Sequence, residues 1–124
     1  MKQYFFIDRP FSPRNFTQLN SPNKTSIKIS WLEIPQNETG ENFDGYKVRF
    51  YMRGMTERTN LTTTSLPARP NGQPNYERVT KDGQTFLEYT ITGLNPQKQY
   101  YVWVLGYNNM GDGDSTTREL LSKL

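Results

Sequence analysis

The sequence of 124 residues contains no cysteine and no histidine. Without cysteine the chain has no disulfide framework, no thiolate nucleophile and no cysteine-bound metal, although this absence leaves the cellular compartment open. Without histidine it has no imidazole base, no histidine metal ligand and no side chain that ordinarily titrates near neutral pH. These two absences remove the groups on which most enzymes depend, so we expect no catalytic activity and no cofactor.

Long apolar runs are also absent, because no segment approaches the ~20 apolar residues of a membrane-spanning helix. Near the N-terminus only Tyr4–Ile7 form an apolar run, which is shorter than the roughly 7–15 residues of a signal-peptide core. This run is compatible with a strand, with pairing to a neighbouring molecule, or with a domain junction. If the domain is secreted, we expect its signal sequence and any membrane anchor outside this chain.

Charge of either sign is not concentrated in one segment. The chain carries 15 Lys and Arg against 12 Asp and Glu, a net charge of +3, and the basic residues are scattered along it. Nucleic-acid-binding modules usually gather their basic residues in a patch, so we expect no nucleic-acid partner and no direct membrane contact by this domain. We interpret the small excess of positive charge as a contribution to ordinary solubility, and weak contact with heparin or acidic lipids is left open.

The residues that are abundant favour β-structure. Aromatic residues make up 14% of the chain, and Gly and Pro interrupt short segments rich in Tyr, Thr, Val, Ile and Phe. Alternating apolar residues predict strands over residues 25–34, 46–53, 84–94, 100–107 and 114–120, with a short edge strand over 57–64. Residues 65–76 are expected to be irregular. About seven short strands without a helical pattern predict a single all-β, two-sheet sandwich.

Several motifs have the spacing of a known domain family. They are Trp31 in a strand, Gly45-Tyr46-x-Val48-x-Phe50, then Leu94-x-Pro96-x-x-x-Tyr100-x-Val102-x-Val104, and finally Asn108-x-x-Gly111-x-Gly113-x-Ser115. Together these motifs make the chain resemble a fibronectin type III domain over residues 10–120. Residues 1–9 would then be an N-terminal extension or linker, and residues 121–124 a C-terminal tail.

The resemblance implies structural roles for four residues: Trp31, Tyr46, Leu94 and Tyr100. Trp31 is expected to fill the space between the sheets, and the Tyr100 hydroxyl to bond back to the backbone near Leu94. Two departures are noted. The segment between the third strand and Gln84 is longer than the family usually needs, and the Arg-Gly-Asp of integrin-binding members and the Trp-Ser-x-Trp-Ser of cytokine receptors are both missing.

In this family the third, sixth and seventh strands share a sheet, which would bring residues 46–53 beside residues 100–107. Arg49, Tyr51, Tyr101 and Trp103 would then lie on its outer face, and aromatic and Arg side chains are enriched at binding hot spots. The hypothesis is a protein-binding surface that is substantially exposed to solvent. The equally weighted alternative is that these rings and the Arg stem only cover their own sheet.

Four Asn-x-Thr tripeptides mark candidate glycosylation sites, at Asn15, Asn23, Asn37 and Asn60. Chance alone would give roughly two, and all four fall in predicted turns, edges or strand starts, which favours the secretory pathway. The turn containing Asp112 and Asp114 offers too few oxygens for calcium, so no metal site is expected. Nothing forces Glu33, Glu41 and Asp44 together as an acid–base pair.

By analogy with the family, the chain is expected to be an extracellular interaction and spacer module of an adhesion molecule or a single-pass plasma-membrane receptor. Its partners would be proteins, including neighbouring fibronectin type III or immunoglobulin-like domains and a second copy of itself. The alternatives are an intracellular muscle-type spacer and an accessory module of a secreted enzyme.

Overall fold

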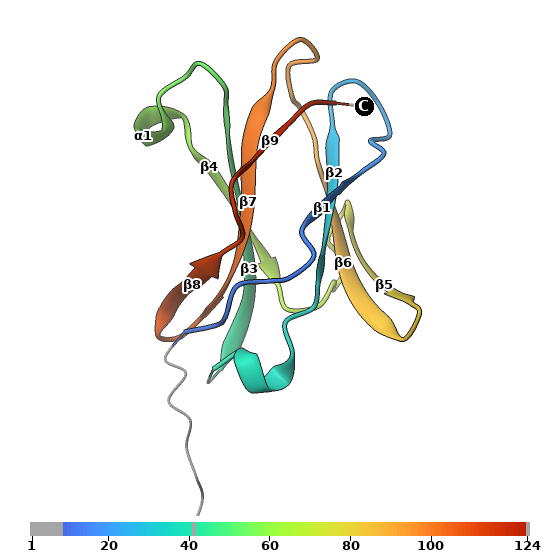
Figure 1. Cartoon of the computed structure of the whole chain (residues 1–124), viewed down its shortest axis with the longest axis vertical. Helices are drawn as coiled ribbons and strands as arrows, with labels where there is room; N and C mark the ends of the chain where they lie inside the picture. The colour runs from blue at the N-terminus through green and yellow to red at the C-terminus, as the bar shows by residue number, and fades with distance from the viewer. Residues whose placement is uncertain (1–8, 41, 124) are drawn as a thin grey trace, which may run out of the picture.

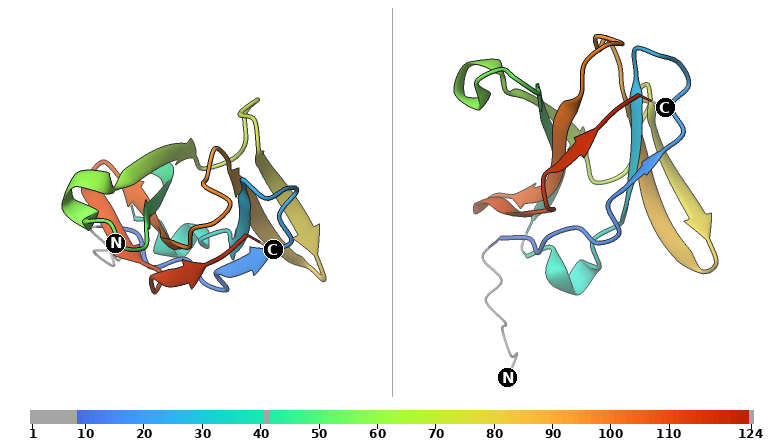
Figure 2. Two further views of the ribbon diagram at one scale, coloured as in Figure 1. Left: turned by 90° about the horizontal axis from the view of Figure 1, so that it is seen from above. Right: turned by 45° about the horizontal axis from the view of Figure 1, so that its top comes forward.

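Nine β-strands form two antiparallel sheets in the computed structural model, which describes residues 9–40 and 42–123. The first sheet has the order β1 (Thr17–Leu19), β2 (Ile27–Leu32), β6 (Gln84–Ile91) and β5 (Tyr76–Lys81). The second sheet joins β4 (Thr62–Pro67), β3 (Phe43–Met52) and β7 (Tyr100–Asn108), and β7 also pairs with β8 (Gly111–Ser115) and β9 (Glu119–Leu121). The sheets face each other (Figures 1 and 2), which confirms the predicted all-β sandwich.

The strands that the sequence did not reveal are polar edge strands. Strand β5 lies in the segment after residue 64 where no clear strand was expected, and of its residues only Tyr76 is buried. An edge strand with one buried residue shows no apolar alternation, so its pattern cannot be read from the sequence. Residues Glu57–Asn60, expected in an edge strand, form the single-turn helix α1, and Gln36–Glu38 form the 3-10 turn η1.

The last predicted strand is divided at Thr116. The Thr116 N–H donates to the Val104 carbonyl at 2.8 Å, and the Thr116 Oγ1 accepts from the Val104 N–H at 3.0 Å. The hydroxyl thus replaces a backbone carbonyl as the partner of β7, and the chain leaves the ladder between β8 and β9. Strand β9 continues to Leu121, one residue into the expected C-terminal tail.

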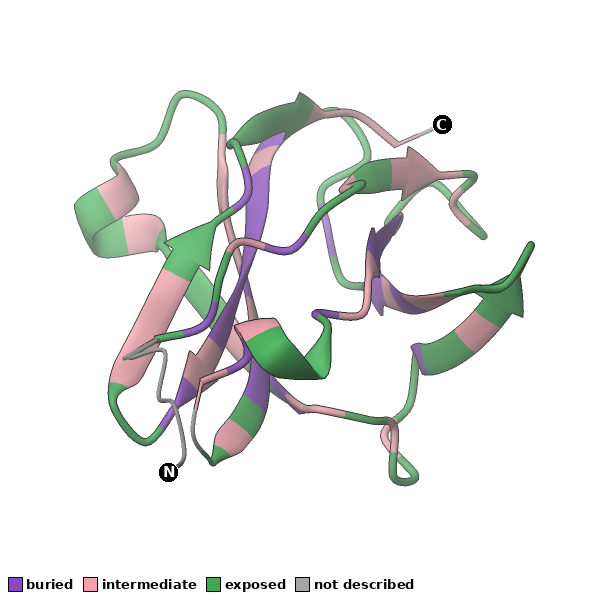
Figure 3. Cartoon of the chain, turned by 60° about the horizontal axis from the view of Figure 1, so that its bottom comes forward, coloured by how far each residue is buried: buried purple, intermediate pink, exposed green. Residues whose placement is uncertain are grey.

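The core lies between the sheets, and the buried residues are concentrated on their strands (Figure 3). It is built around Trp31, which is fully buried. The Trp31 ring lies 5.4 Å from the Tyr46 ring on β3 and 6.5 Å from the Tyr76 ring on β5, measured between centroids. Aliphatic side chains from both sheets complete this cluster: Ile27, Ile29, Val48, Leu66, Leu87, Ile91, Val102 and Val104. Alternate residues of β2, β3, β6 and β7 therefore face inward, as the strand period of two requires.

Three buried tyrosines each bring a polar hydroxyl to the margin of this core. The Tyr46 hydroxyl accepts from the Ile34 N–H at 2.9 Å, and burial raises the pKa of Tyr46 to about 12. The Tyr76 hydroxyl donates to the Pro67 carbonyl at 2.7 Å, which ties the first sheet to the end of β4. The Tyr100 hydroxyl accepts from the Asn95 N–H at 2.8 Å, next to the buried Leu94. Each hydroxyl fixes a loop to a strand.

The N-terminal segment bridges the two sheets before β1 begins. The Pro10 carbonyl accepts from the Asp114 N–H of β8 at 3.3 Å, and the Phe11 N–H donates to the Glu38 carbonyl at 2.9 Å. A side chain at Gly113 would place its Cβ only 2.1 Å from the Pro10 carbonyl oxygen. The glycine therefore permits the close passage of this segment over β8.

Replacement of Trp31 by Ala should lower the free energy of unfolding by about 3–5 kcal/mol, because it removes the largest fully buried side chain of the core. Trp31→Phe should cost less, since it keeps an aromatic ring beside Tyr46 and Tyr76 in the core. Urea denaturation measures both. A Trp31→Ala variant that unfolds at the same urea concentration as the parent would contradict the central position of this ring.

Candidate functional site

The strand register brings the four predicted binding residues together on the outer face of the second sheet. Arg49 on β3 lies opposite Trp103 on β7, and Tyr51 lies opposite Tyr101. Directly opposed residues in an antiparallel pair share a face. With Lys47, Tyr107, Glu57, Asp112 and Arg118, described below, these residues form what we call the aromatic–cation cluster.

Trp103 is buried in this cluster, with 3% of its surface exposed. The Arg118 guanidinium carbon lies 4.0 Å from the centre of the Trp103 ring, and the Tyr51 ring meets the indole edge to face at 6.0 Å. The expectation of a solvent-exposed Trp103 is therefore wrong. The neighbouring outward residue Leu105 is equally buried, so β7 is covered on both faces.

Arg118 is held over the indole by a second contact. Its guanidinium donates two hydrogen bonds to the Glu57 carboxylate of α1, Nη1 to Oε1 at 2.5 Å and Nη2 to Oε2 at 3.0 Å. The hydrogen bond from Arg118 lowers the pKa of Glu57 below its ordinary value, and the Glu57 carboxylate raises the pKa of Arg118. This bidentate pair links the segment between β3 and β4 to the segment between β8 and β9. It also fixes the guanidinium over Trp103.

Asp112 organises the other end of the cluster. Its carboxylate accepts from Lys47 Nζ at 2.7 Å and from Arg49 Nη2 at 2.8 Å. Burial acts to raise the pKa of Asp112, but the hydrogen bonds from Lys47 and Arg49 outweigh it and the pKa is lowered. Lys47 Nζ also lies 4.8 Å from the centre of the Tyr107 ring. The acidic turn considered for calcium thus supplies a counter-ion for two cations of the face.

The accessible part of the face lies toward β9. The Tyr51 and Tyr101 rings are half-buried and lie 5.1 Å apart, and Leu120 on β9 is directly opposite Tyr101 with 36% of its surface exposed. Sequence reasoning did not identify Leu120, Arg118 or Glu57. Their place depends on the break at Thr116 and on the one-turn helix α1, and neither has a signal in the sequence.

The four Asn-x-Thr asparagines differ in what their side chains do. Asn15, Asn23 and Asn37 are exposed, and Asn23 uses its Oδ1 to accept from the Thr25 N–H at 2.9 Å. Asn60 is half-buried at the end of α1, where its Nδ2 donates to the Thr56 carbonyl at 2.9 Å and to the Thr59 hydroxyl at 3.0 Å. An N-linked sugar is attached to Nδ2, so glycosylation of Asn60 would disturb these bonds whereas the other three side chains have room.

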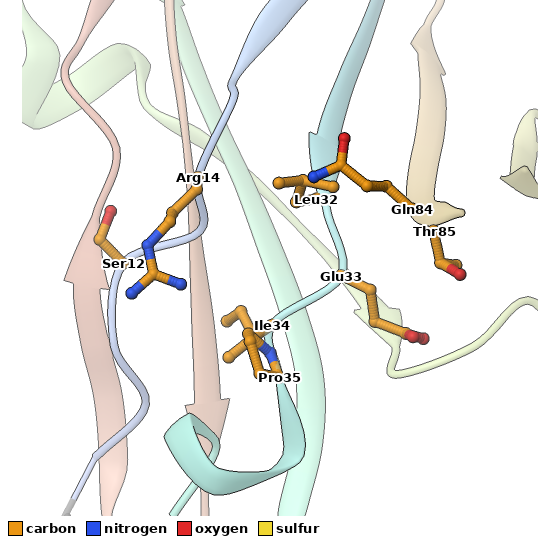
Figure 4. A pocket seen from close by; sticks show the side chains of 8 residues that line it. All are labelled: Ser12, Arg14, Leu32, Glu33, Ile34, Pro35, Gln84 and Thr85. Atoms are coloured by element: carbon orange, nitrogen blue, oxygen red, sulfur yellow. The ribbon is translucent and has the colours of Figure 1, made fainter. Parts of the chain in front are cut away.

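A pocket of about 470 Å³ lies beside the end of β2, lined by residues that include Ser12, Arg14, Glu33 and Gln84 (Figure 4). Its charged groups are engaged, because Arg14 pairs with Glu38 at 2.9 Å and Glu33 accepts two hydrogen bonds from Arg78 at 2.9 and 3.0 Å. Among the described residues no group of three or more acidic side chains is placed to hold a metal ion. No helix in the described part of the chain is long and apolar enough to cross a membrane.

Comparison with known proteins gives a consistent result. A family model described as "Fibronectin type III domain" matches residues 11–120. The chain is 28% identical to Contactin of Drosophila melanogaster over 104 residues, which cover 84% of this chain and 6% of Contactin. It is 30% identical to receptor-type tyrosine-protein phosphatase F of Mus musculus over 108 residues, 86% of this chain and 5% of that protein.

Solved structures show the same fold. The FN5 domain of Drosophila Lar superimposes with a TM-score of 0.58 at 20% identity, over 90% of this chain and 94% of that one. The chain therefore spans about one-twentieth of the length of the curated relatives described above, and nearly the full length of a single solved domain.

Trp103→Ala should destabilise the fold by about 3–5 kcal/mol, because it removes a buried ring and leaves a cavity beneath Arg118. Arg118→Ala should cost about 0.5–2 kcal/mol, chiefly the lost contact with the indole, since its pair with Glu57 is solvent-exposed. A double-mutant cycle in urea should show that the two losses are coupled.

Two matched variants serve as controls for this cycle. Arg58→Ala removes an exposed cation of α1 that forms no ion pair with another described residue, and it should change stability by less than about 0.5 kcal/mol. Tyr101→Ala removes a half-buried ring of the same face and should cost less than Trp103→Ala. If the Trp103 and Arg118 effects are additive, Arg118 does not stabilise the fold through the indole.

Proposed function

Because the chain belongs to the fibronectin type III domain family, a family of non-catalytic modules, we propose that it is an extracellular protein-interaction and spacer module of a multidomain adhesion molecule or receptor. The observation that carries this proposal is the position of the two ends of the domain. Arg9 lies beside Gly111 at the β7–β8 turn, with its Nε 3.4 Å from where a Gly111 Cβ would stand. Ser122 lies at the other end of β7, where its Oγ accepts from Gln99 Nε2 at 3.1 Å.

This arrangement makes the domain a linear link. Strand β7 runs between the two ends with nine residues, or about 30 Å at ~3.3 Å per residue. Figure 1 shows the described chain entering at the bottom of the sandwich and leaving at the top. A chain that enters at one end and leaves at the other adds its own length to an array, which is what a spacer between fibronectin type III or immunoglobulin-like neighbours requires.

The four residues predicted to bind a protein, Arg49, Tyr51, Tyr101 and Trp103, differ in how accessible their side chains are. Trp103 and Arg49 are engaged in covering β7, whereas Tyr51, Tyr101 and Leu120 present half-exposed apolar surface on the same face. Tyrosine is enriched at binding hot spots, since its ring offers apolar area together with a hydroxyl. We assign contact with a protein partner, including a second copy, to these three side chains.

The extracellular setting, in a single-pass plasma-membrane protein, rests on the three accessible asparagines. Asn15, Asn23 and Asn37 are exposed, and the contact of Asn23 to Thr25 uses its Oδ1, so a glycan on Nδ2 would extend into solvent. An intracellular muscle-type spacer would carry no such glycan. An accessory module of a secreted enzyme would carry one, and the chemistry would then belong to another domain.

Expression in a glycosylating host should add N-linked sugar at one or more of Asn15, Asn23 and Asn37. Mass spectrometry before and after enzymatic removal of N-glycans measures it, and the Asn60→Gln variant should carry as much sugar as the parent. A chain secreted with no sugar on any of these three asparagines would contradict the argument for an extracellular setting.

Two copies joined end to end by a short linker should form an elongated particle. Its maximum dimension in small-angle X-ray scattering should be roughly twice that of one copy, because the entry and exit points lie at opposite ends of β7. A compact particle in which the two copies fold back side by side would contradict the spacer geometry.

A further inference from the structure

The connection between β4 and β5, residues 68–75, contains a motif that neither the fold nor the proposed function uses. It belongs to the segment before Gln84 that is longer than the family usually needs, and it contains the dipeptide Asn71-Gly72. Of the asparagines in the chain, Asn71 is the only one that is followed by glycine. Because glycine has no side chain, the backbone nitrogen that follows this asparagine is the least shielded of its kind.

The dipeptide lies in the open. Both residues are exposed and outside the strands, and Figure 2 shows this connection projecting from the sandwich just before β5. Gly72 has a φ of +83°, and a Cβ added to it would meet no atom within 4 Å beyond its chain neighbours. The Asn71 N–H donates to Gln73 Oε1 at 2.5 Å. Among the described residues, however, the Gly72 N–H has no acceptor and the Asn71 side-chain amide has no partner.

An asparagine in this setting reacts with its own backbone. The Gly72 nitrogen attacks Cγ of Asn71, the new N–Cγ bond closes a cyclic imide, and Nδ2 leaves as ammonia with the proton of the Gly72 N–H. Water then opens the imide at one of its two carbonyl carbons. Opening at Cγ gives aspartate, and opening at the backbone carbonyl carbon gives isoaspartate, in which the main chain passes through Cβ and Cγ. Water is the only other reactant, since the two reacting groups are neighbours in one chain.

Comparable groups elsewhere are restrained by the fold or by their chemistry. Asn108 is buried, its Nδ2 donates to the Thr39 carbonyl at 3.1 Å, and its Oδ1 accepts from the Met110 N–H at 2.8 Å. Asn95 precedes Pro96, which has no N–H to lose in the reaction. The three aspartates that precede glycine carry a carboxylate, and its negative charge repels a nucleophile. The reaction is therefore favoured at the β4–β5 connection.

We propose that Asn71 is a deamidation site, at which the folded protein acquires an aspartate or isoaspartate carboxylate with time. The change lowers the net charge of +3 by one. Arg69 is positioned to answer it, because its side chain is 69% exposed and its Nε lies a loose 3.8 Å from Glu33 Oε2. Glu33 keeps the two hydrogen bonds from Arg78 if Arg69 turns to the new carboxylate. This inference does not rest on the proposed function, so either can fail without the other.

Contacts at both ends of the connection separate this site from the core. The Tyr76 hydroxyl donates to the Pro67 carbonyl at 2.7 Å, and the Thr90 N–H donates to the Asn75 carbonyl at 2.9 Å. The additional main-chain atom of isoaspartate lies between these two anchors. We therefore expect the modified protein to melt cooperatively at the temperature of the unmodified protein.

The test incubates the full chain in neutral buffer, folded or unfolded in guanidinium chloride, and follows each asparagine by peptide mass spectrometry. Isoaspartate is counted with a carboxyl methyltransferase that uses S-adenosylmethionine and recognises this residue. In the folded chain Asn71 should react faster than every other asparagine. Its rate should lie within about threefold of its rate in the unfolded chain, because a segment that is already open gains little from unfolding. Asn108 should react faster in the unfolded chain than in the folded one.

Variants identify the reacting groups. Asn71→Gln should remove the isoaspartate, and Gly72→Ala should slow its formation at least about tenfold, since a Cβ hinders the approach of the nitrogen. Asn20→Gln replaces another exposed asparagine outside the strands, and this control should form as much isoaspartate as the parent. Three results would overturn the proposal: strong protection of Asn71 in the folded chain, an unchanged rate in Gly72→Ala, or an earlier reaction at another asparagine.

Discussion

The structure depends on strand β7 being buried on both of its faces. Val102 and Val104 face the core, and Trp103 and Leu105 face outward, yet all four are almost inaccessible to solvent. A two-layer sandwich has no third layer to cover the outward side of a central strand. The cover here comes from side chains of connecting segments, chiefly Arg118 over the indole and the pairing of Lys47 and Arg49 with Asp112.

This form of cover gives the connecting segments a structural role. Helix α1 supplies Glu57, the break between β8 and β9 supplies Arg118, and the β7–β8 hairpin supplies Asp112. An apolar cover would leave an exposed hydrophobic patch of the kind that promotes association. Guanidinium stems cover aromatic rings while their charged ends remain at the surface, so the face is closed without becoming apolar.

The sequence predicts the parts of the molecule that repeat with the period of a strand. The alternation around Trp31 and Val102 predicts the core strands, and the spacing from Leu94 to Tyr100 anticipates the bond at the Tyr100 hydroxyl. It does not predict β5, whose exposed residues show no alternation, or the burial of Trp103. The side a residue faces follows from its position in the strand. What covers that side comes from residues distant in sequence, as the pair of Glu57 and Arg118, 61 positions apart, illustrates.

The charged residues can also be divided into those that stabilise the fold and those that remain without a counter-charge. Cations that hold the fold have carboxylate partners, because a charge that is partly removed from water needs a counter-charge: Arg118 has Glu57, Arg49 has Asp112, and Arg78 has Glu33. Cations without such a role need no partner. Basic residues that are scattered along a sequence of net charge +3 can therefore lie close together in the folded domain. Among the described residues, six cations have no carboxylate within ion-pair distance: Arg9, Lys24, Arg53, Arg58, Lys98 and Lys123. Four of them, Lys24, Arg53, Lys98 and Lys123, lie on connections or at the C-terminal end, outside the strands. The position of this free charge follows from how the sandwich is held together, and an even distribution along the sequence does not reveal it.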